Sequence, residues 1–472
     1  MIPIILLFPV AAAPFIYFVK SRTLNHIVLI IYALLMSTVT GILYKNGGHW
    51  SPFLQTDPLN IVFLIIMSIL FLGVAFYNRA YFKHHDIGIK AETEYTIFFL
   101  FFVASMAGVL LSTHLALMWV FIEATTLFSA PLIYVERSRS SLEAAWKYIF
   151  ICSIGISLAF VGIILLSIGT KSVDSLFFKD LYSNAKTIVP FWLKFSFPFI
   201  LIGLGTKMGL APVHAWLPDA HSESPSPVSA MLSGTLLNAA FLGILRVFKL
   251  MTLAGLDYYA RTLLLVMGLL SLVVSAIFIL RTNNFKRMLA YSSIENMGII
   301  SLGIATGGIA YYASFLHVIS HSLAKGSFFL TAGNILNRFH TKEIDKVRGI
   351  LQIDKINGWL WIGSFAAISG IPPFPSFISE FLITMELFRG HQYIIAGIFF
   401  LVFTIILFGM GRSVMHMAFG PADPHLVKAS PAPMTYIPQI GFLMLAVVIG
   451  IYTPDILNNL LKWASALLTD IV

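Results

Sequence analysis

Residues 201–232 read LIGLGTKMGLAPVHAWLPDAHSESPSPVSAML, and residues 367–383 read AISGIPPFPSFISEFLI. Both are apolar runs interrupted by proline and glycine, and proline breaks a helix because it removes a backbone donor. Broken backbone at membrane depth is tolerated only where it is buried in protein or lines a cavity. Each break lies within a turn or two of a charge, Lys207 in the first run and Glu380 in the second. Two ordinary proline kinks are the alternative explanation.

The composition places both runs in a membrane protein. Of the 472 residues, 58% are hydrophobic and 11% are charged, whereas soluble domains average about 25% charged residues. So few charges cannot cover the water-facing surface of so long a chain. The single cysteine, Cys152, excludes a disulfide scaffold and, on this chain alone, an iron–sulfur or CxxC-type zinc site.

Apolar runs that are long enough to span a bilayer, about 20 residues of helix, recur along the chain. The predicted fold class is an all-α polytopic membrane protein with about fourteen transmembrane helices, the first of them retained rather than cleaved as a signal peptide. An amphipathic segment, 455–469, follows the last helix. We place the spans at 2–19, 24–44, 58–78, 96–113, 115–135, 144–168, 190–211, 228–249, 261–280, 287–306, 309–336, 357–386, 391–418 and 434–452.

The two broken runs belong to the seventh and twelfth predicted helices, five helices apart. An odd-numbered repeat flips its copy across the membrane, so this spacing predicts two inverted five-helix repeats with discontinuous helices 7 and 12. The predicted division is 1–95 for helices 1–3, 96–250 for the first repeat, 251–420 for the second repeat, and 421–472 for the last helix and the amphipathic segment.

Lysine and arginine set the expected orientation. They are about twice as frequent in loops after odd-numbered helices as in the other loops, and cytoplasmic loops carry such an excess. We therefore predict a multi-pass protein of the cell inner (cytoplasmic) membrane with both termini on the non-cytoplasmic side. The net charge of +9 is spread over many short loops, which argues against nucleic acid as a partner.

Five charges lie deep in the apolar sequence of predicted spans: Lys147, Lys207, Lys325, Glu123 and Glu380. A charge at mid-membrane costs about 3 kcal/mol, so it normally faces a partner or a water-filled cavity. We expect a polar axis along the centre of the bundle that could carry protons in the membrane plane. Static ion pairs that orient helices are the alternative.

Histidines extend this set. His317, His321 and Lys325 follow one another at spacings of four, which puts them on one helix face. Imidazole titrates near neutral pH, so the face suits a proton relay. The pair could instead be buried without function or bind a metal, although HExxH is absent and Lys325 would repel a cation. We predict no metal site.

Four stretches carry a resemblance: KMGLAPVHAWLPDAHSESPSPVSAML, RMLAYSSIENMG, HVISHSLAKGSFFLTAGNIL and SGIPPFPSFISEFL. They resemble the antiporter-like subunits of respiratory complex I, which are similar to the large subunits of Mrp-type cation/proton antiporters and of membrane-bound group 4 hydrogenases. The resemblance covers the fourth to the thirteenth helix. By position, Glu123 resembles the family's fifth-helix glutamate, Lys207 its seventh-helix lysine partner and Lys147 its sixth-helix lysine. Glu380 stands at the twelfth-helix position, where members carry Lys or Glu.

Three further residues follow from the resemblance with less support. His214 and His221 lie in the WLPDAH context and would line an access path. Asn238 stands in the eighth helix, where complex I members place a central lysine, and an asparagine cannot carry a proton as a charge. The link from Lys207 to the eleventh helix must then use water or the HxxxHxxxK face. This departure is closer to hydrogenase-4 and formate hydrogenlyase subunits.

The resemblance implies a proton-translocating subunit of a complex I-related redox complex, of membrane-bound hydrogenase, formate hydrogenlyase or NADH:quinone oxidoreductase type. The sequence has no dinucleotide fingerprint, P-loop or cysteine cluster. No cofactor is therefore expected on this chain, and whether it counts as an enzyme stays open. Iron–sulfur clusters and NiFe or flavin would lie on partner subunits. The expected partners are other membrane subunits, a peripheral redox arm, the lipid bilayer and protons, with Na⁺ as a further cargo.

Two other functions stay open. One is an Mrp-type Na⁺(K⁺)/H⁺ antiporter subunit, or an inorganic-carbon uptake subunit, without a redox partner. The other is a structural membrane scaffold, against which the buried charges argue. Neighbouring genes would separate the first from the redox function: a NiFe large subunit with iron–sulfur partners, or a cluster of small antiporter subunits.

Overall fold

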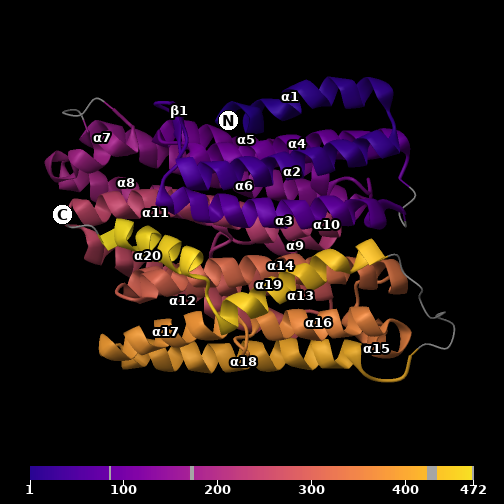
Figure 1. Cartoon of the computed structure of the whole chain (residues 1–472). Coiled ribbons are helices and arrows are strands. Elements are labelled where there is room, and N and C mark those ends of the chain that lie inside the picture. The colour runs from indigo at the N-terminus through magenta and orange to yellow at the C-terminus, as the bar shows by residue number, and fades with distance from the viewer. Residues whose placement is uncertain (84–86, 171–174, 423–432, 470–472) are drawn as a thin grey trace.

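The computed structural model describes residues 1–83, 87–170, 175–422 and 433–469. They form a bundle of long helices that run roughly along one common axis (Figure 1). A small antiparallel sheet, β1 (His49–Ser51) with β2 (Leu54–Gln55), lies at one end. We call this the β1 end, and the opposite one, which carries α15 (Ile350–Ile353), the α15 end.

Each of the fourteen predicted segments coincides with helical structure. The longer helices are α1 (Ile2–Val19), α2 (Arg22–Asn46), α3 (Pro58–Lys83), α4 (Ile89–Leu111), α5 (Leu115–Ile133), α6 (Arg139–Gly169), α8 (Pro190–Met208), α11 (Leu237–Leu253), α12 (Asp257–Arg281), α13 (Phe285–Thr306), α14 (Ala310–Phe339), α16 (Lys355–Ile368), α17 (Pro375–Arg389), α18 (Tyr393–Ala418), α19 (Ile437–Ile451) and α20 (Asp455–Thr469). The shorter pieces are α7 (Phe178–Ser183), η1 (Ala185–Thr187), α9 (Trp216–Glu223), α10 (Ser226–Met231), η2 (Leu232–Leu236), η3 (Ile344–Lys346) and η4 (Pro433–Thr435).

The prediction that the chain is a helical membrane protein is confirmed. Within the described residues, nine helices are long and apolar enough to cross a membrane, or ten if the bent pair α19 and α20 forms one span. The count of fourteen spans and the two repeats stay predictions. The last predicted unit, 421–472, includes residues 423–432 and 470–472, which lie outside the described part of the chain.

Both predicted interruptions are present. α8 ends at Met208, and Gly209 takes the left-handed conformation (φ 80°) that commonly terminates a helix. The chain then forms the short helices α9 and α10, and the π-helical turn η2 leads into α11. Likewise α16 ends at Ile368 and α17 begins at Pro375. π-helical turns occur often at functional sites, so the region around η2 is of interest.

Small residues bring α6 and α8 close together. A Cβ atom on Gly203 of α8 would lie 2.5 Å from the carbonyl oxygen of Gly155 on α6. No larger residue fits here without separating the helices, and small residues at such crossings are typical of membrane bundles. The close contact fixes α8, and with it Lys207, against α6.

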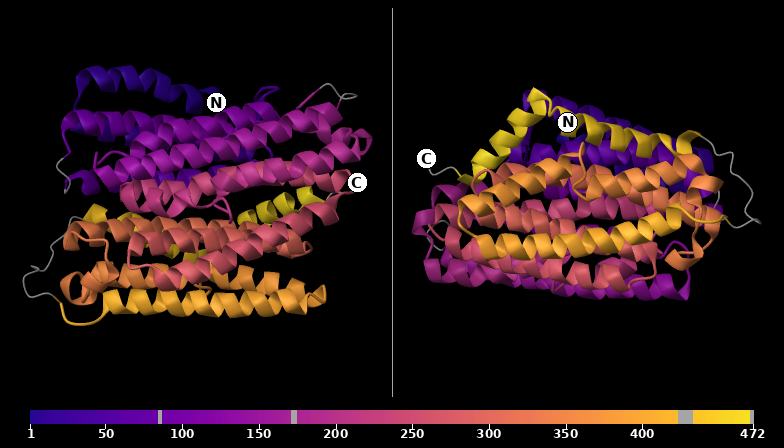
Figure 2. Two further views of the ribbon diagram at one scale, coloured as in Figure 1. Left: turned by 180° about the vertical axis from the view of Figure 1, so that it is seen from behind. Right: turned by 90° about the horizontal axis from the view of Figure 1, so that it is seen from below.

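The helices form two adjoining groups, one from the first half of the chain and one from the second (Figures 1 and 2). α19 and α20 pack against both α3 and α14. They therefore lie across the boundary between the two groups, which we call the seam. The predicted amphipathic segment is α20. Its buried face, which includes Leu460, Leu461 and Ala464, packs on the bundle, whereas Trp463 is exposed.

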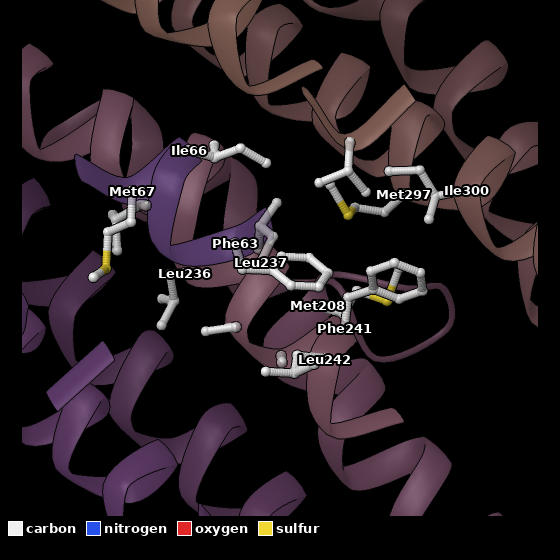
Figure 3. Packing of buried hydrophobic residues seen from close by; sticks show 14 of the residues in the cluster. Phe63, Ile66, Met67, Met208, Leu236, Leu237, Phe241, Leu242, Met297 and Ile300 are labelled. Atoms are coloured by element: carbon white, nitrogen blue, oxygen red, sulfur yellow. The ribbon is translucent and has the colours of Figure 1, made fainter. Parts of the chain in front are cut away.

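The core at the seam is apolar. α11 is buried between the groups, and its Phe241 meets Phe63 of α3 with ring centroids 6.1 Å apart. Met208, Leu237 and Met297 belong to the same cluster, which draws side chains from α3, α8, α11 and α13 (Figure 3). Polar contacts between the two groups lie outside this cluster, for example where the hydroxyl of Tyr77 on α3 donates to the carbonyl of Leu330 on α14.

Both described ends of the chain lie at the β1 end. α1 contacts β1, and Leu467 of α20 lines the same cavity as His49. An even number of crossings, such as the fourteen predicted, would place both ends on the same side. That the β1 end faces away from the cytoplasm stays a prediction.

Candidate functional site

Lys207 is fully buried in the last turn of α8, directly before the break. Its Nζ donates a hydrogen bond to the hydroxyl of Tyr148 on α6 at 2.7 Å and lies 4.7 Å from the centre of that ring. The Tyr148 hydroxyl is in turn 2.6 Å from Oγ of Ser129 on α5. Hydroxyls both donate and accept, so this chain of groups can pass a proton.

Glu123 lies on α5, the helix that carries Ser129. Oγ of Ser153 donates to Oε1 of Glu123 at 3.1 Å, and Oε2 is buried without a hydrogen-bond partner among the described residues. Glu123 interacts electrostatically with Lys207. The direct hydrogen-bond partner of Lys207 is the Tyr148 hydroxyl. A direct pair between Glu123 and Lys207 therefore stays a prediction.

The predicted HxxxHxxxK residues are fully buried on α14. Nζ of Lys325 donates to the backbone carbonyl of Leu289 on α13 at 2.8 Å. The ring of His317 is held at both nitrogens: Nδ1 is 2.8 Å from Oγ of Ser379 on α17, and Nε2 is 2.9 Å from Oδ1 of Asn296 on α13. His317 thus joins three helices.

His321 and His221 lie deeper in the same region. Both rings are fully buried, and within the described part of the chain their nitrogens have no hydrogen-bond partner. His221 comes from α9 and stacks on Phe329 of α14, with ring centroids 4.7 Å apart. His321 interacts electrostatically with both His221 and Lys325. Buried polar groups of this kind are normally bridged by ordered water, so the region suits a hydrated relay.

Two carboxyl groups adjoin this relay. Glu380 of α17 follows the second break and is 7% exposed, and Glu295 of α13 is 2% exposed. Glu295 interacts electrostatically with both Lys325 and Glu380. In the residues that the structure describes, Oε1 of Glu380 and Oε2 of Glu295 have no hydrogen-bond partner. Glu295 was missed from the sequence because its neighbours in SSIENMG are polar, although an acid inside a predicted span was a usable signal.

Asn238 connects the two groups of helices at the seam. Its Nδ2 donates to the carbonyl of Gly234 at 2.7 Å and to Oγ of Ser322 on α14 at 2.8 Å. A second polar contact lies nearby, where Oγ of Ser233 is 2.8 Å from Oγ of Ser293 on α13. These contacts are two of the polar connections between the groups.

We call the fully or almost fully buried charged side chains the buried row: Lys207, Lys325, Glu295 and Glu380. Lys147 does not belong to it, which corrects the expectation from the sequence. Its side chain is 47% exposed, and Nζ pairs with Glu143 at 2.7 Å and with Asp219 at 3.0 Å. Arg287 also pairs with Asp219, at 2.7 Å. α6 has 31 residues and is about 46 Å long, whereas the hydrocarbon core is about 30 Å thick. The first turns of α6, with Lys147, therefore extend toward the α15 end.

Two other basic groups lie close to α9. His214, a weaker candidate, is partly buried, and its Nδ1 has no partner in the described ranges. Lys286 falls between the predicted spans 261–280 and 287–306, but it is 1% exposed and donates from Nζ to the carbonyl of Ser224 at 2.6 Å. Among the described residues, no three His, Cys, Asp or Glu side chains are grouped to hold a metal ion.

The fold and this row of buried ionisable groups define an ion-translocating type of membrane subunit. Residues 112–407 match the family model described as NADH:quinone oxidoreductase/Mrp antiporter, TM. The chain belongs to this family, which confirms the resemblance found in its motifs: it is an antiporter-like subunit of the complex I-related kind.

Relatives agree with this assignment, and a solved structure shares the fold. A hydrogenase-4 component F homolog of Methylacidiphilum infernorum (isolate V4) is 34% identical over 441 residues, which cover 90% of this chain and 91% of the relative. Na(+)/H(+) antiporter subunit A1 of Staphylococcus aureus (strain JH9) is 28% identical over 92% of this chain, which spans 57% of that protein. A chain of the membrane-bound sulfane sulfur reductase, an archaeal respiratory membrane complex, shares the fold with a TM-score of 0.89 at 23% identity, covering 99% of this chain and 97% of that one.

Proposed function

We propose that this chain translocates protons along its row of buried charges, as the antiporter-like membrane subunit of a complex I-related redox complex of the membrane-bound hydrogenase type. One observation carries the proposal: Lys207, Lys325, Glu295 and Glu380 come from four helices and are all buried in an apolar bundle. Since each charge costs about 3 kcal/mol in the membrane core, helix packing alone does not account for four of them.

The first part of the path lies in α5, α6 and α8. Glu123 and Lys207 form the switchable pair. Lys207 donates to the hydroxyl of Tyr148, which contacts Ser129 on the same helix as Glu123. A lysine that approaches a carboxylate keeps its proton, and one that moves away can release it, so a change in this pair drives the proton onward.

The second part lies in α13, α14 and α17. The proton crosses the seam through water beside Asn238 and reaches the HxxxHxxxK face. Lys325 takes it up there, and Glu295 and Glu380 pass it toward one side of the membrane. His317 is held by Asn296 and Ser379, and this keeps α13, α14 and α17 in register for the transfer.

The packing supports the predicted repeats 96–250 and 251–420. In the first group α4, α5, α6 and α8 pack each on the next, and in the second group α12, α13, α14 and α16 do the same. The piece after each break packs on the third helix of its group, α9 on α6 and α17 on α14. In this correspondence Glu123 on α5 and Glu295 on α13 occupy equivalent helices, which is the relation that an inverted repeat produces.

The remaining assignments rest on the predictions from the sequence, and the similarity to a hydrogenase-4 component supports them. Iron–sulfur and NiFe or flavin centres would lie on partner subunits in a peripheral arm. The complex would stand in the cytoplasmic membrane, with the α15 end of this chain toward the cytoplasm. The antiporter subunit A1 favours a second function, exchange of Na⁺ for protons without redox chemistry.

The test uses Lys207→Ala and Glu123→Gln in the intact complex reconstituted in vesicles. Redox-coupled proton uptake should fall at least about tenfold in both, because a proton carrier is lost, while electron transfer to an artificial acceptor continues. Arg348→Ala, an exposed position at the α15 end, is the control. Wild-type pumping in both variants rules out the proposed axis, and proton movement driven by a Na⁺ gradient without a redox partner favours the second function.

A further inference from the structure

A basic pocket lies at the α15 end, apart from the buried row of charges. It has a volume of about 350 Å³ and opens to the outside of the bundle. Arg22 and His26 of α2 and Arg79 and Lys83 of α3 line it, with Glu92 of α4 among them. We call it the α2–α3 pocket.

The chain builds this pocket from two adjacent antiparallel helices. α2 begins at the α15 end, where Ser21 caps its first turn, and α3 ends there. Each helix contributes two basic side chains four residues apart, and residues at this spacing share a helix face. The four side chains therefore meet on one outer surface at the level where a helix leaves the membrane.

The pocket has more positive than negative charge. Glu92 is almost fully buried, with Arg22 Nε at 3.3 Å and His26 Nε2 at 3.5 Å from its carboxylate. This one acid holds Arg22 and His26 in place. Arg79 and Lys83 are exposed and form no ion pair within the described ranges. Two cations thus remain available to an anion from outside.

An exposed apolar stripe continues from the pocket along α2. Ile27, Ile31 and Leu34 are 48%, 47% and 49% exposed, and their spacing puts them on one side of the helix. A ligand that satisfies both features has an anionic head and apolar tails. Free phosphate would use only the first feature.

We propose that the α2–α3 pocket binds the phosphate group of an anionic phospholipid, with the acyl chains lying along α2. Basic pockets between membrane helices suit such headgroups, and each Lys or Arg near the surface strengthens the attraction about fivefold. The site does not depend on the proton path, because none of its residues belongs to the buried row.

Native mass spectrometry of the delipidated full chain in detergent tests the site with phosphatidylglycerol and phosphatidylcholine in equal amounts. We expect preferential retention of phosphatidylglycerol, and an affinity loss of about 25-fold in the double variant Arg79→Gln/Lys83→Gln. The matched control Arg348→Gln/Lys355→Gln removes the same charges from exposed positions at the same end and should stay within about twofold of wild type.

Four results would overturn the proposal. Equal retention of both lipids, or an equal loss in the control, indicates unspecific attraction. Displacement of phosphatidylglycerol by millimolar inorganic phosphate indicates a site for the free ion. Absence of phosphatidylglycerol from the purified whole complex, although the isolated chain binds it, assigns the pocket to a neighbouring subunit.

Discussion

The two groups of helices satisfy their buried charges in different ways. In the first, Lys207 donates to a tyrosine hydroxyl, and Glu123 accepts from a serine at Oε1, although its buried Oε2 has no partner among the described residues. In the second, Lys325 donates to a backbone carbonyl, and Glu295 and Glu380 each keep a buried oxygen without a partner among the described residues. A buried charge that has few hydrogen-bond partners in the protein depends on partners that can move, such as water or a proton. We therefore expect protonation to change mainly in the second group, with the first group controlling when it does.

Glu380→Gln should have the largest effect of the substitutions in the second group. Glutamine keeps the size of the side chain but cannot carry the proton, so redox-coupled pumping should fall at least about tenfold. Vesicle acidification and the yield of assembled complex are measured together. Glu386→Gln, on the same helix but paired with Arg389 at the surface, is the control. Loss of the assembled complex with normal pumping per complex would instead assign Glu380 to a static structural role.

Glu295→Gln compares the two groups directly, because its counterpart is Glu123. We expect a reduction of pumping of about tenfold and normal assembly, since Glu295 interacts with both Lys325 and Glu380. Ser292→Ala, one turn away on α13, controls for disturbed packing. If Glu295→Gln pumps like wild type while Glu123→Gln does not, the second group moves protons without this acid and the equivalence of the two helices has no functional meaning.

The sequence predicted the elements of the fold well because their signals are local. Apolar runs give the helices, and the proline and glycine residues around Gly209 and before Pro375 give the two breaks. The segment 455–469 was correctly predicted to be amphipathic, and α20 has those bounds. Which helices cover its apolar face depends on tertiary packing, and a local sequence pattern does not reveal tertiary packing.

The site was predicted less completely, because it depends on tertiary packing. Lys325, His317 and His321 share a face by spacing alone, and the structure places all three in the core. Glu295 was not predicted as a site residue because its neighbours in the sequence are polar. Lys147 was predicted to lie in the core, but it forms an exposed ion pair with Glu143. Local hydropathy does not record where a helix leaves the membrane or which side chain faces the lipid.

Asn238→Leu tests whether proton transfer between the two groups of helices passes Asn238 at the seam. Leucine fills the space but removes the hydrogen bonds to Ser322 and Gly234. One such bond is worth about 1 kcal/mol, so pumping should fall about fivefold. The control is Asn357→Leu, a buried hydrogen-bonded asparagine outside the row. Unchanged pumping would mean that the proton crosses elsewhere, and the contact of Ser233 with Ser293 would be the next place to test.

Lys147→Ala should have the smallest effect on pumping. It compares the role that the family resemblance implies for Lys147 with the position that the structure gives it. By position in the family Lys147 is a proton carrier, whereas the structure pairs it with two acidic side chains, Glu143, which is exposed, and Asp219, which is 20% exposed. Exposed ion pairs contribute little, so pumping should stay within about twofold of wild type. Asp219→Asn is the informative companion, because Asp219 also pairs with Arg287 and joins α6, α9 and α13. If Lys147→Ala abolishes pumping while Asp219→Asn leaves it intact, Lys147 acts as a carrier and must move inward during transport.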